Sequence, residues 1–163
     1  MQLDCDIEQP WPDNGWEDLA QKVVGAAGKI APELANQRLI VSLLFTSDDH
    51  IHALNREWRE RDKPTNVLSF PMLARDEVLK VAAQGPPVML GDIALAYETC
   101  AREAAEKSVS IEDHASHLLC HGLLHLAGYD HEISDQEADK MEDLEVKALA
   151  LLQIADPYGG LGA

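Results

Sequence analysis

Three histidines in one short segment constrain this chain more than any other feature of its sequence. His121 and His125 are four residues apart within an apolar run, and His131 follows them after Gly128. On an α-helix, residues four apart lie on one face, one turn apart, so both imidazoles can reach a single ion. Gly128 can take the left-handed conformation that ends a helix and reverses the chain. The pattern therefore predicts a helix, a turn and a metal site made by His121, His125 and His131.

The kind of metal site follows from the donors. Three neutral imidazoles bind zinc and leave a fourth tetrahedral position for water, which is the plan of a catalytic site. We expect one zinc ion per chain. Cys120 would point about 100° away from His121 on a helix, so it is not expected to be a ligand. His117 continues the same row one turn earlier, either supporting a ligand or lying in the core. The other histidines are expected at the surface or at helix caps: His50, His52 and His114.

The spacing HxxxHxxGxxH is also that of the metzincin zinc proteases, which gives an alternative function. Those enzymes carry Glu directly after the first histidine, as the general base for the zinc-bound water. Here Gly122 occupies that position and cannot transfer a proton. A zinc metalloprotease-like hydrolase would therefore lack its main catalytic group in this chain.

A second candidate feature is the basic segment within residues 55–70. Arg56, Arg59 and Lys63 are three and four residues apart, so a continuous helix would align them in one cationic stripe. Guanidinium and ammonium groups suit phosphate oxygens. Spacing alone favours another interpretation, a solvated helix face paired with nearby acids: Glu57, Glu60 and Asp62.

Hydrophobic periodicity predicts an α+β fold over residues 1–163, taken as one domain with a small mixed β-sheet and about five helices. One of these helices would be the zincin-like metal-binding helix. The expected strands are residues 2–8, 38–46, 67–70 and 88–96. The expected helices are residues 16–30, 48–60, 99–107, 111–126 and 135–154, with caps at Ser47, Ser110 and Ser134.

Two glycine-containing segments carry separate predictions. Residues 72–87, which include Gly85-Pro86-Pro87, are predicted to form a loop. Gly91 lies inside an apolar strand, where a glycine indicates either a close backbone approach or a bulge.

Charge and cysteine content bound the partners and the compartment. Asp and Glu outnumber Lys and Arg by 29 to 13, which gives a net charge of −16. So acidic a surface repels nucleic acid at long range, and RNA binding would need a local basic patch or a helper protein. Three scattered cysteines indicate reduced thiols in a cytosolic protein. An acidic N-terminus and the lack of a long apolar run predict neither a signal peptide nor a membrane span.

The sequence closely resembles the YbeY family of bacterial endoribonucleases over about residues 45–158. The matching elements are HGLLHLAGYDH at 121–131, RERDKPTNVLSF at 59–70, LGDI at 90–93 and Asp-Pro-Tyr at 156–158. The resemblance implies zinc on His121, His125 and His131, with Arg59 and His121 as catalytic residues. It also implies substrate contacts in the basic segment: Arg56, Lys63, Thr65 and Asn66.

The resemblance also implies a function. It implies a single-strand-specific, zinc-dependent endoribonuclease in the cytoplasm, acting in 3′-end maturation of 16S ribosomal RNA and in ribosome quality control. The implied partners are ribosomal RNA, the small ribosomal subunit and ribosome-assembly proteins, with no membrane and no nucleotide cofactor. A non-catalytic ribosome-assembly factor with a structural zinc is the remaining alternative. A structural site should lose its fold when the metal is removed.

Overall fold

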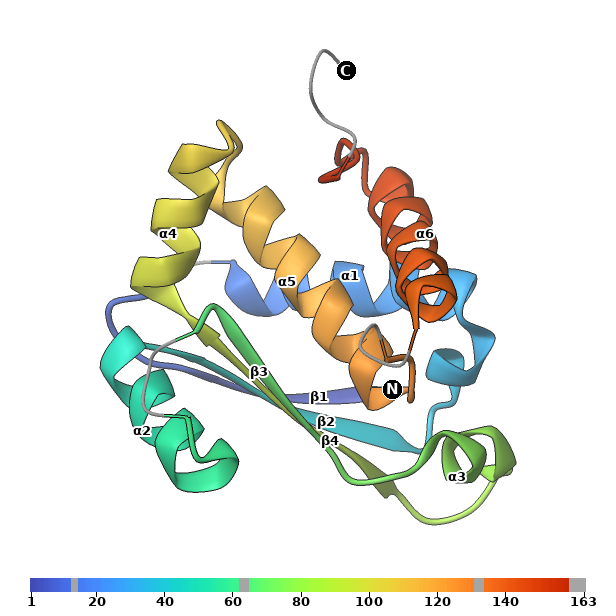
Figure 1. Cartoon of the computed structure of the whole chain (residues 1–163). Helices are drawn as coiled ribbons and strands as arrows, with labels where there is room; N and C mark the ends of the chain where they lie inside the picture. The colour runs from blue at the N-terminus through green and yellow to red at the C-terminus, as the bar shows by residue number, and fades with distance from the viewer. Residues whose placement is uncertain (13–14, 62–64, 131–133, 159–163) are drawn as a thin grey trace.

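A mixed β-sheet with helices on both faces forms the fold of the computed structural model, which describes residues 1–12, 15–61, 65–130 and 134–158 (Figure 1). The strands lie in the order β1-β2-β4-β3, with β3 antiparallel to β4 and the other pairs parallel. The strands are β1 (Gln2–Ile7), β2 (Leu39–Thr46), β3 (Val67–Pro71) and β4 (Val88–Ala96). The helices are α1 (Trp16–Ile30), α2 (Asp48–Arg59), α3 (Arg75–Lys80), α4 (Tyr97–Glu106), α5 (Ile111–Leu126) and α6 (Asp135–Leu151), with a 3₁₀ turn at Pro32–Ala35. The predicted mixed sheet and α+β class are confirmed.

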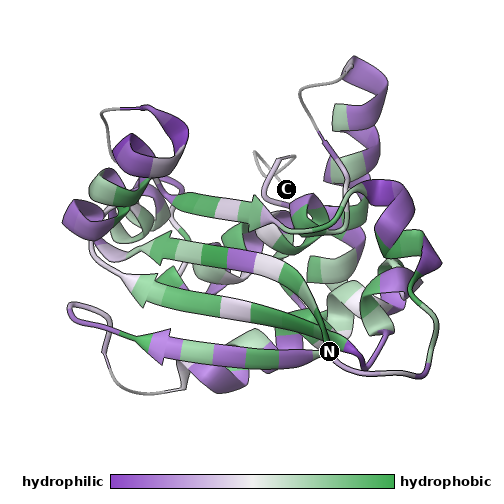
Figure 2. Cartoon of the chain, turned by 90° about the horizontal axis from the view of Figure 1, so that it is seen from below, coloured by the Kyte–Doolittle hydropathy of each residue, from purple (hydrophilic) through white to green (hydrophobic). Residues whose placement is uncertain are grey.

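Alternation of side chains along the strands divides the core between the two faces of the sheet. On β2, Leu39, Val41, Leu43 and Phe45 are buried on the face that carries the main core. The opposite face packs Leu68 and Ala94 against Ile51 of α2. The edge strand β1 alternates exposed and half-buried residues, and its colours alternate accordingly in Figure 2. The sheet therefore has one thickly covered face and one face that α2 covers in part.

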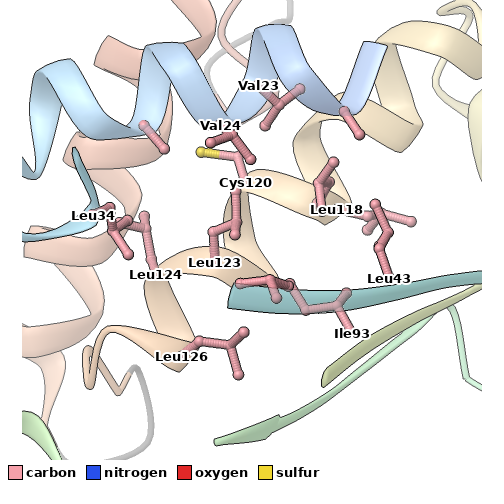
Figure 3. Close-up of a cluster of buried hydrophobic side chains, with 14 of the residues drawn as sticks. Val23, Val24, Leu34, Leu43, Ile93, Leu118, Cys120, Leu123, Leu124 and Leu126 are labelled. Atoms are coloured by element: carbon pink, nitrogen blue, oxygen red, sulfur yellow. The ribbon is translucent and has the colours of Figure 1, made fainter. Parts of the chain in front are cut away.

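Helix α5 is the central helix of the covered face. It contacts α1, α4, α6 and both β3 and β4. Figure 3 shows leucines of α5 between side chains of α1 and those of the sheet. A Cβ at Gly122 would lie 3.1 Å from Cδ1 of Ile93, so the helix sits close to β4 at this residue. This close packing holds the histidine-bearing helix on a rigid support.

The start of each helix that was predicted from a serine cap is confirmed. Ser47, Ser110 and Ser134 each accept a hydrogen bond from the backbone N–H three residues later, at 3.2, 3.0 and 3.1 Å. These caps satisfy N–H groups that have no partner within the helix. Cys100 and Cys120 are buried free thiols, and Cys5 is half-buried.

One local prediction is wrong, and the condition for another is not met. Residues 72–87 contain helix α3, too short to leave a periodic apolar pattern. Helix α2 ends at Arg59, because Glu60 has a φ of 56° and a left-handed residue cannot continue a right-handed helix. A single cationic stripe needed a helix that continues past Glu60, and Lys63 itself lies outside the described residues.

Gly91 shows both features that a strand glycine can indicate. The register between β2 and β4 shifts beside it, where Ile40 pairs with Met89 but Val41 pairs with Gly91. A Cβ at this residue would lie 2.5 Å from the carbonyl oxygen of Phe70 and 2.7 Å from a methyl group of Leu126. The backbone of β3 and the end of α5 therefore approach β4 more closely than any side chain would allow. Among the described residues, no helix is long and apolar enough to cross a membrane.

Candidate active site

Two of the three predicted ligands lie side by side on α5. The ring centroids of His121 and His125 are 4.7 Å apart, with an angle of 79° between the ring planes. Both histidines line a cavity of about 550 Å³. The other described residues that line it come from α2, β3, the segment between them and the turn after α5: Asn55, Arg59, Arg61, Thr65, Asn66, Val67, Leu68, Ser69, Pro71 and Asp130.

The turn after α5 has the predicted form. Gly128 has a φ of 101°, and its backbone N–H donates to the carbonyl oxygen of His125 at 2.9 Å. The N–H of Tyr129 donates to Leu124 at 3.0 Å, so the last carbonyls of the helix are satisfied as the chain reverses. His131, the third predicted ligand, lies outside the described residues. In the described part of the chain, no three His, Cys, Asp or Glu side chains are grouped as a metal site.

A buried carboxylate lies behind His121. Glu145 of α6 is fully buried, and its Oε1 lies 3.3 Å from Nδ1 of His121 and 2.9 Å from Nε2 of His117. The hydroxyl of Tyr158 donates to the same oxygen at 2.9 Å. His117 is thus both a buried residue and part of the support of a predicted ligand, which joins the two interpretations of it.

The hydrogen bonds at Glu145 decide its charge. Burial alone would raise the pKa of this carboxyl, but the hydrogen bonds from His117 and His121 outweigh burial and lower the pKa from 4.5 to about 2. Burial, with the negative Glu145 beside it, raises the pKa of the Tyr158 hydroxyl. Glu145 is therefore ionised and Tyr158 neutral across the physiological range.

These residues fit a zinc ion. A carboxylate that accepts the N–H at Nδ1 of His121 leaves the lone pair of the neutral ring on Nε2, which is the form that binds a metal. His125 presents a second imidazole one turn along the same helix, beside the same cavity. Imidazole donors with a carboxylate behind them are the usual surroundings of zinc.

Arg59, the last residue of α2, lines the same cavity as the two histidines. Its guanidinium donates from Nη2 to the carbonyl oxygen of Ser69 and lies 5.2 Å from the ring centroid of Phe70. Both contacts are to β3, so the strand holds the guanidinium beside the cavity that His121 and His125 line. The structure thus brings Arg59 and the two histidines, 62 and 66 residues apart in sequence, to one cavity.

The predicted substrate-binding residues are divided by the structure. Thr65 and Asn66 line the cavity, while Arg56 is exposed on α2 and is not among its described lining residues. Lys63 lies outside the described residues. The side-chain amide of Asn66 donates to Oε1 of Glu103 on α4 at 2.9 Å, and the backbone carbonyl of Asn66 accepts from the backbone N–H of Ala96 at 2.9 Å. Asn66 therefore anchors the cavity wall to α4 and β4.

No role was predicted from the sequence for several residues of the site. Glu145 and Tyr158 support His121, and Asn55, Arg61 and Asp130 line the cavity. For Glu145 a signal existed, because a carboxylate interrupts the buried row of Met141, Ala148 and Leu149 on α6. The expectation for His114 is wrong. It is buried, with Nε2 2.9 Å from Glu103, because α4 and α5 pack together there.

Comparison with known proteins gives consistent relatives. A family model described as Endoribonuclease YbeY matches residues 3–153. A protein of Erythrobacter litoralis named Endoribonuclease YbeY is 62% identical over 159 residues, which cover 98% of each chain. A protein of the same name from Novosphingobium aromaticivorans is 61% identical over 158 residues, 96% of this chain and 95% of the relative. The solution structure of a Thermotoga maritima protein matches with a TM-score of 0.59 over 93% of this chain and 92% of that chain, at 24% identity, which shows the shared fold.

Proposed function

The chain belongs to the YbeY family of endoribonucleases, and on this premise we propose that it cleaves single-stranded RNA with one zinc ion held by His121, His125 and His131. Its substrate would be 16S ribosomal RNA near the 3′ end, within the small ribosomal subunit in the cytoplasm, where it would serve maturation and quality control. Ribosome-assembly proteins would be its protein partners.

One observation supports this proposal more than any other. A single cavity is lined by His121 and His125 of α5 and by Arg59 of α2. Phosphodiester cleavage needs a site that activates a nucleophile and a cation that neutralises the charge developing on the phosphoryl oxygens. The cavity would offer both kinds of group to one phosphate.

Each residue would have a defined part in the reaction. When bound, zinc supplies Lewis-acid chemistry, which makes a good nucleophile available near neutral pH. Arg59, held by Ser69 and Phe70, would donate two parallel hydrogen bonds to the phosphoryl oxygens. Asn66, fixed by Glu103, would keep the cavity wall in place. The nucleophile is water or the RNA 2′-hydroxyl, and a 2′,3′-cyclic phosphate on the product would identify the second.

The net charge of −16 shapes how RNA would reach this site. An acidic surface repels RNA at long range, so the arginines beside the cavity must act locally. We therefore propose that binding to the small subunit or to an assembly protein delivers the RNA. Cleavage of free RNA should accordingly be slow, but faster than cleavage by a variant that lacks one of the metal-binding histidines.

The test is cleavage of a labelled single-stranded RNA by the purified protein, after chelation and again after addition of zinc. The wild-type protein should cut the single-stranded RNA only with metal and should leave double-stranded RNA intact. The His121→Ala variant should not cut the RNA. His50→Ala is the matched control, since His50 pairs with Glu8 outside the cavity. An intact RNA under all conditions would refute the nuclease proposal. Loss of the circular dichroism of the fold on chelation would instead support the assembly factor with a structural zinc.

The protease-like alternative is opposed by the packing of α5. The position that carries the general base in zinc proteases is Gly122, and a Cβ there would meet Ile93 at 3.1 Å. Hydrolysis of casein by the zinc-loaded protein, with RNA left intact, would reverse this conclusion.

A further inference from the structure

The carboxylate of Glu145 is the least expected group in the core. It lies on the buried side of α6, fully removed from solvent, in the row that also carries Met141 and Leu149. A buried charge costs free energy unless hydrogen bonds compensate for it, and an apolar residue of similar size would avoid that cost. Packing alone therefore does not account for a carboxylate at this position.

The carboxylate is held by groups from two other parts of the chain, α5 and the segment after α6. Oε1 accepts the hydroxyl of Tyr158 at 2.9 Å and lies 2.9 Å from Nε2 of His117. Tyr158 and His117 also contact each other, with their polar atoms 3.0 Å apart and their rings perpendicular at 5.2 Å. Nδ1 of His117 is buried with no hydrogen-bond partner among the described residues, which places the proton of a neutral His117 on Nε2. Donors on two sides thus fix the position of Oε1.

The same oxygen faces the ring of His121. Nδ1 of His121 lies 3.3 Å from Oε1. A histidine that binds a metal through Nε2 leaves its Nδ1 free to donate to such a supporting group. An imidazole that donates from Nδ1 to a carboxylate has one tautomer and one orientation. The hydrogen-bonded cluster of Glu145, His117 and Tyr158 is therefore built so that it can determine how His121 meets the cavity.

We propose that Glu145 is a positioning residue that fixes the tautomer and the ring orientation of His121, with His117 and Tyr158 locking its carboxylate in place. The inference rests on the metal site of the proposed function and extends it from α5 to α6 and the segment after α6. It makes zinc affinity depend on Tyr158, a residue 37 positions beyond His121 in the sequence.

Zinc affinity and the His121 tautomer together test the proposal. Glu145→Gln keeps the size of the side chain and removes its charge. Asp143→Asn is the matched control, because it makes the same change on α6 at an exposed carboxylate paired with Lys147. Competition with a chromophoric chelator should show zinc binding weakened about 10- to 100-fold by Glu145→Gln. The control should stay within about twofold of wild type.

The second measurement is the nitrogen chemical shifts of the His121 ring in the metal-free protein. If Glu145 had only a structural role, its substitution would leave these shifts unchanged. Wild type and the control should carry the proton on Nδ1, and Glu145→Gln should shift the tautomer toward Nε2. A folded Glu145→Gln protein with the wild-type tautomer and wild-type zinc affinity overturns the proposal. If wild type binds no zinc, the proposed function fails, while the tautomer shift still decides the role of Glu145.

Tyr158→Phe provides the decisive variant if Glu145→Gln does not fold. It removes only the hydroxyl that donates to Oε1, from a residue that is 46% exposed. We expect zinc affinity to fall roughly two- to tenfold, as for the loss of one hydrogen bond. Unchanged affinity together with an unchanged His121 spectrum would overturn the proposed locking of Glu145.

Discussion

Arg75 donates from Nη1 to the carbonyl oxygen of Ala127 at 2.8 Å, which ties helix α3 to the turn that follows the histidine-bearing helix. The same guanidinium pairs with Glu33 and lies 4.3 Å from the ring centroid of Tyr129. The hydroxyl of Tyr129 donates to Glu33 at 3.0 Å and closes the group. The turn after α5 is thus held from outside by a helix that sequence periodicity did not predict.

Removal of the Arg75 side chain and its contacts should destabilise the protein. Arg75→Ala breaks a partly buried ion pair and leaves the Ala127 carbonyl without its donor, so we expect a loss of about 1–3 kcal/mol in the free energy of unfolding. Urea denaturation measures it. Arg102→Ala, which loses only an exposed pair with Glu106, should stay within about 0.5 kcal/mol of wild type. Equal stability of the two variants would mean that the contacts of Arg75 make no measurable contribution to the free energy of unfolding.

Zinc content should depend on each predicted ligand. We expect about one zinc per chain in the purified protein, and a severe reduction in His125→Ala and in His131→Ala, because each loses a nitrogen donor. Elemental analysis of the purified variants measures this, with His50→Ala as the control. Full zinc retention by either variant would remove that histidine from the ligand set.

Loss of the Arg59 guanidinium should lower turnover without unfolding the protein. By analogy with an oxyanion donor, Arg59→Ala should cost on the order of 2.7–4 kcal/mol in the transition state, about a hundredfold or more in rate. Arg59→Lys should restore only part of this, because an ammonium cannot reproduce the two-pronged contact. RNA cleavage rates, zinc content and Tm are compared with those of Arg102→Ala. If Arg59→Ala melts early while its folded fraction keeps full activity, the contacts with Ser69 and Phe70 are structural only.

Acid should destabilise the metal-free protein partly through Glu145. Its pKa is lowered from 4.5 to about 2, so the folded state binds its proton less readily than the unfolded chain does. The stability from this group is complete above pH 4.5 and is lost as the pH falls toward 2. The free energy of unfolding of Glu145→Gln should therefore fall less than that of wild type between pH 5 and about 2.5. Parallel pH profiles of the two proteins would contradict the hydrogen-bonded, ionised state of Glu145.

A glutamate at position 122 should not create a protease. Gly122→Glu adds a side chain where a Cβ already lies 3.1 Å from Ile93, and overpacking of this kind costs typically 1–3 kcal/mol. We expect a lower Tm and no digestion of casein, measured beside wild type. Strong proteolysis with loss of RNA cleavage would show that the chemistry of the site has been misread.

The predictable parts of this protein are those that depend on local sequence. The strands and long helices follow from apolar periodicity, and His121, His125 and Gly128 carry their geometry in their spacing. Glu145 could not be assigned to His121 in this way, because their contact depends on how α6 packs on α5. Helix α3 was missed since its six residues hold one buried apolar side chain, Val78.

Gly91 has a consequence for how this site can vary. The missing methyl group leaves room for Leu126, the neighbour of His125, and for the carbonyl of Phe70, the neighbour of the Ser69 that holds Arg59. The Cα of Gly91 on β4 thus limits how closely both α5 and β3 approach this strand. A methyl group added at Gly91 would push away both α5, which carries His121 and His125, and β3, which holds Arg59. A substitution at this position therefore cannot move the histidines without also moving the arginine.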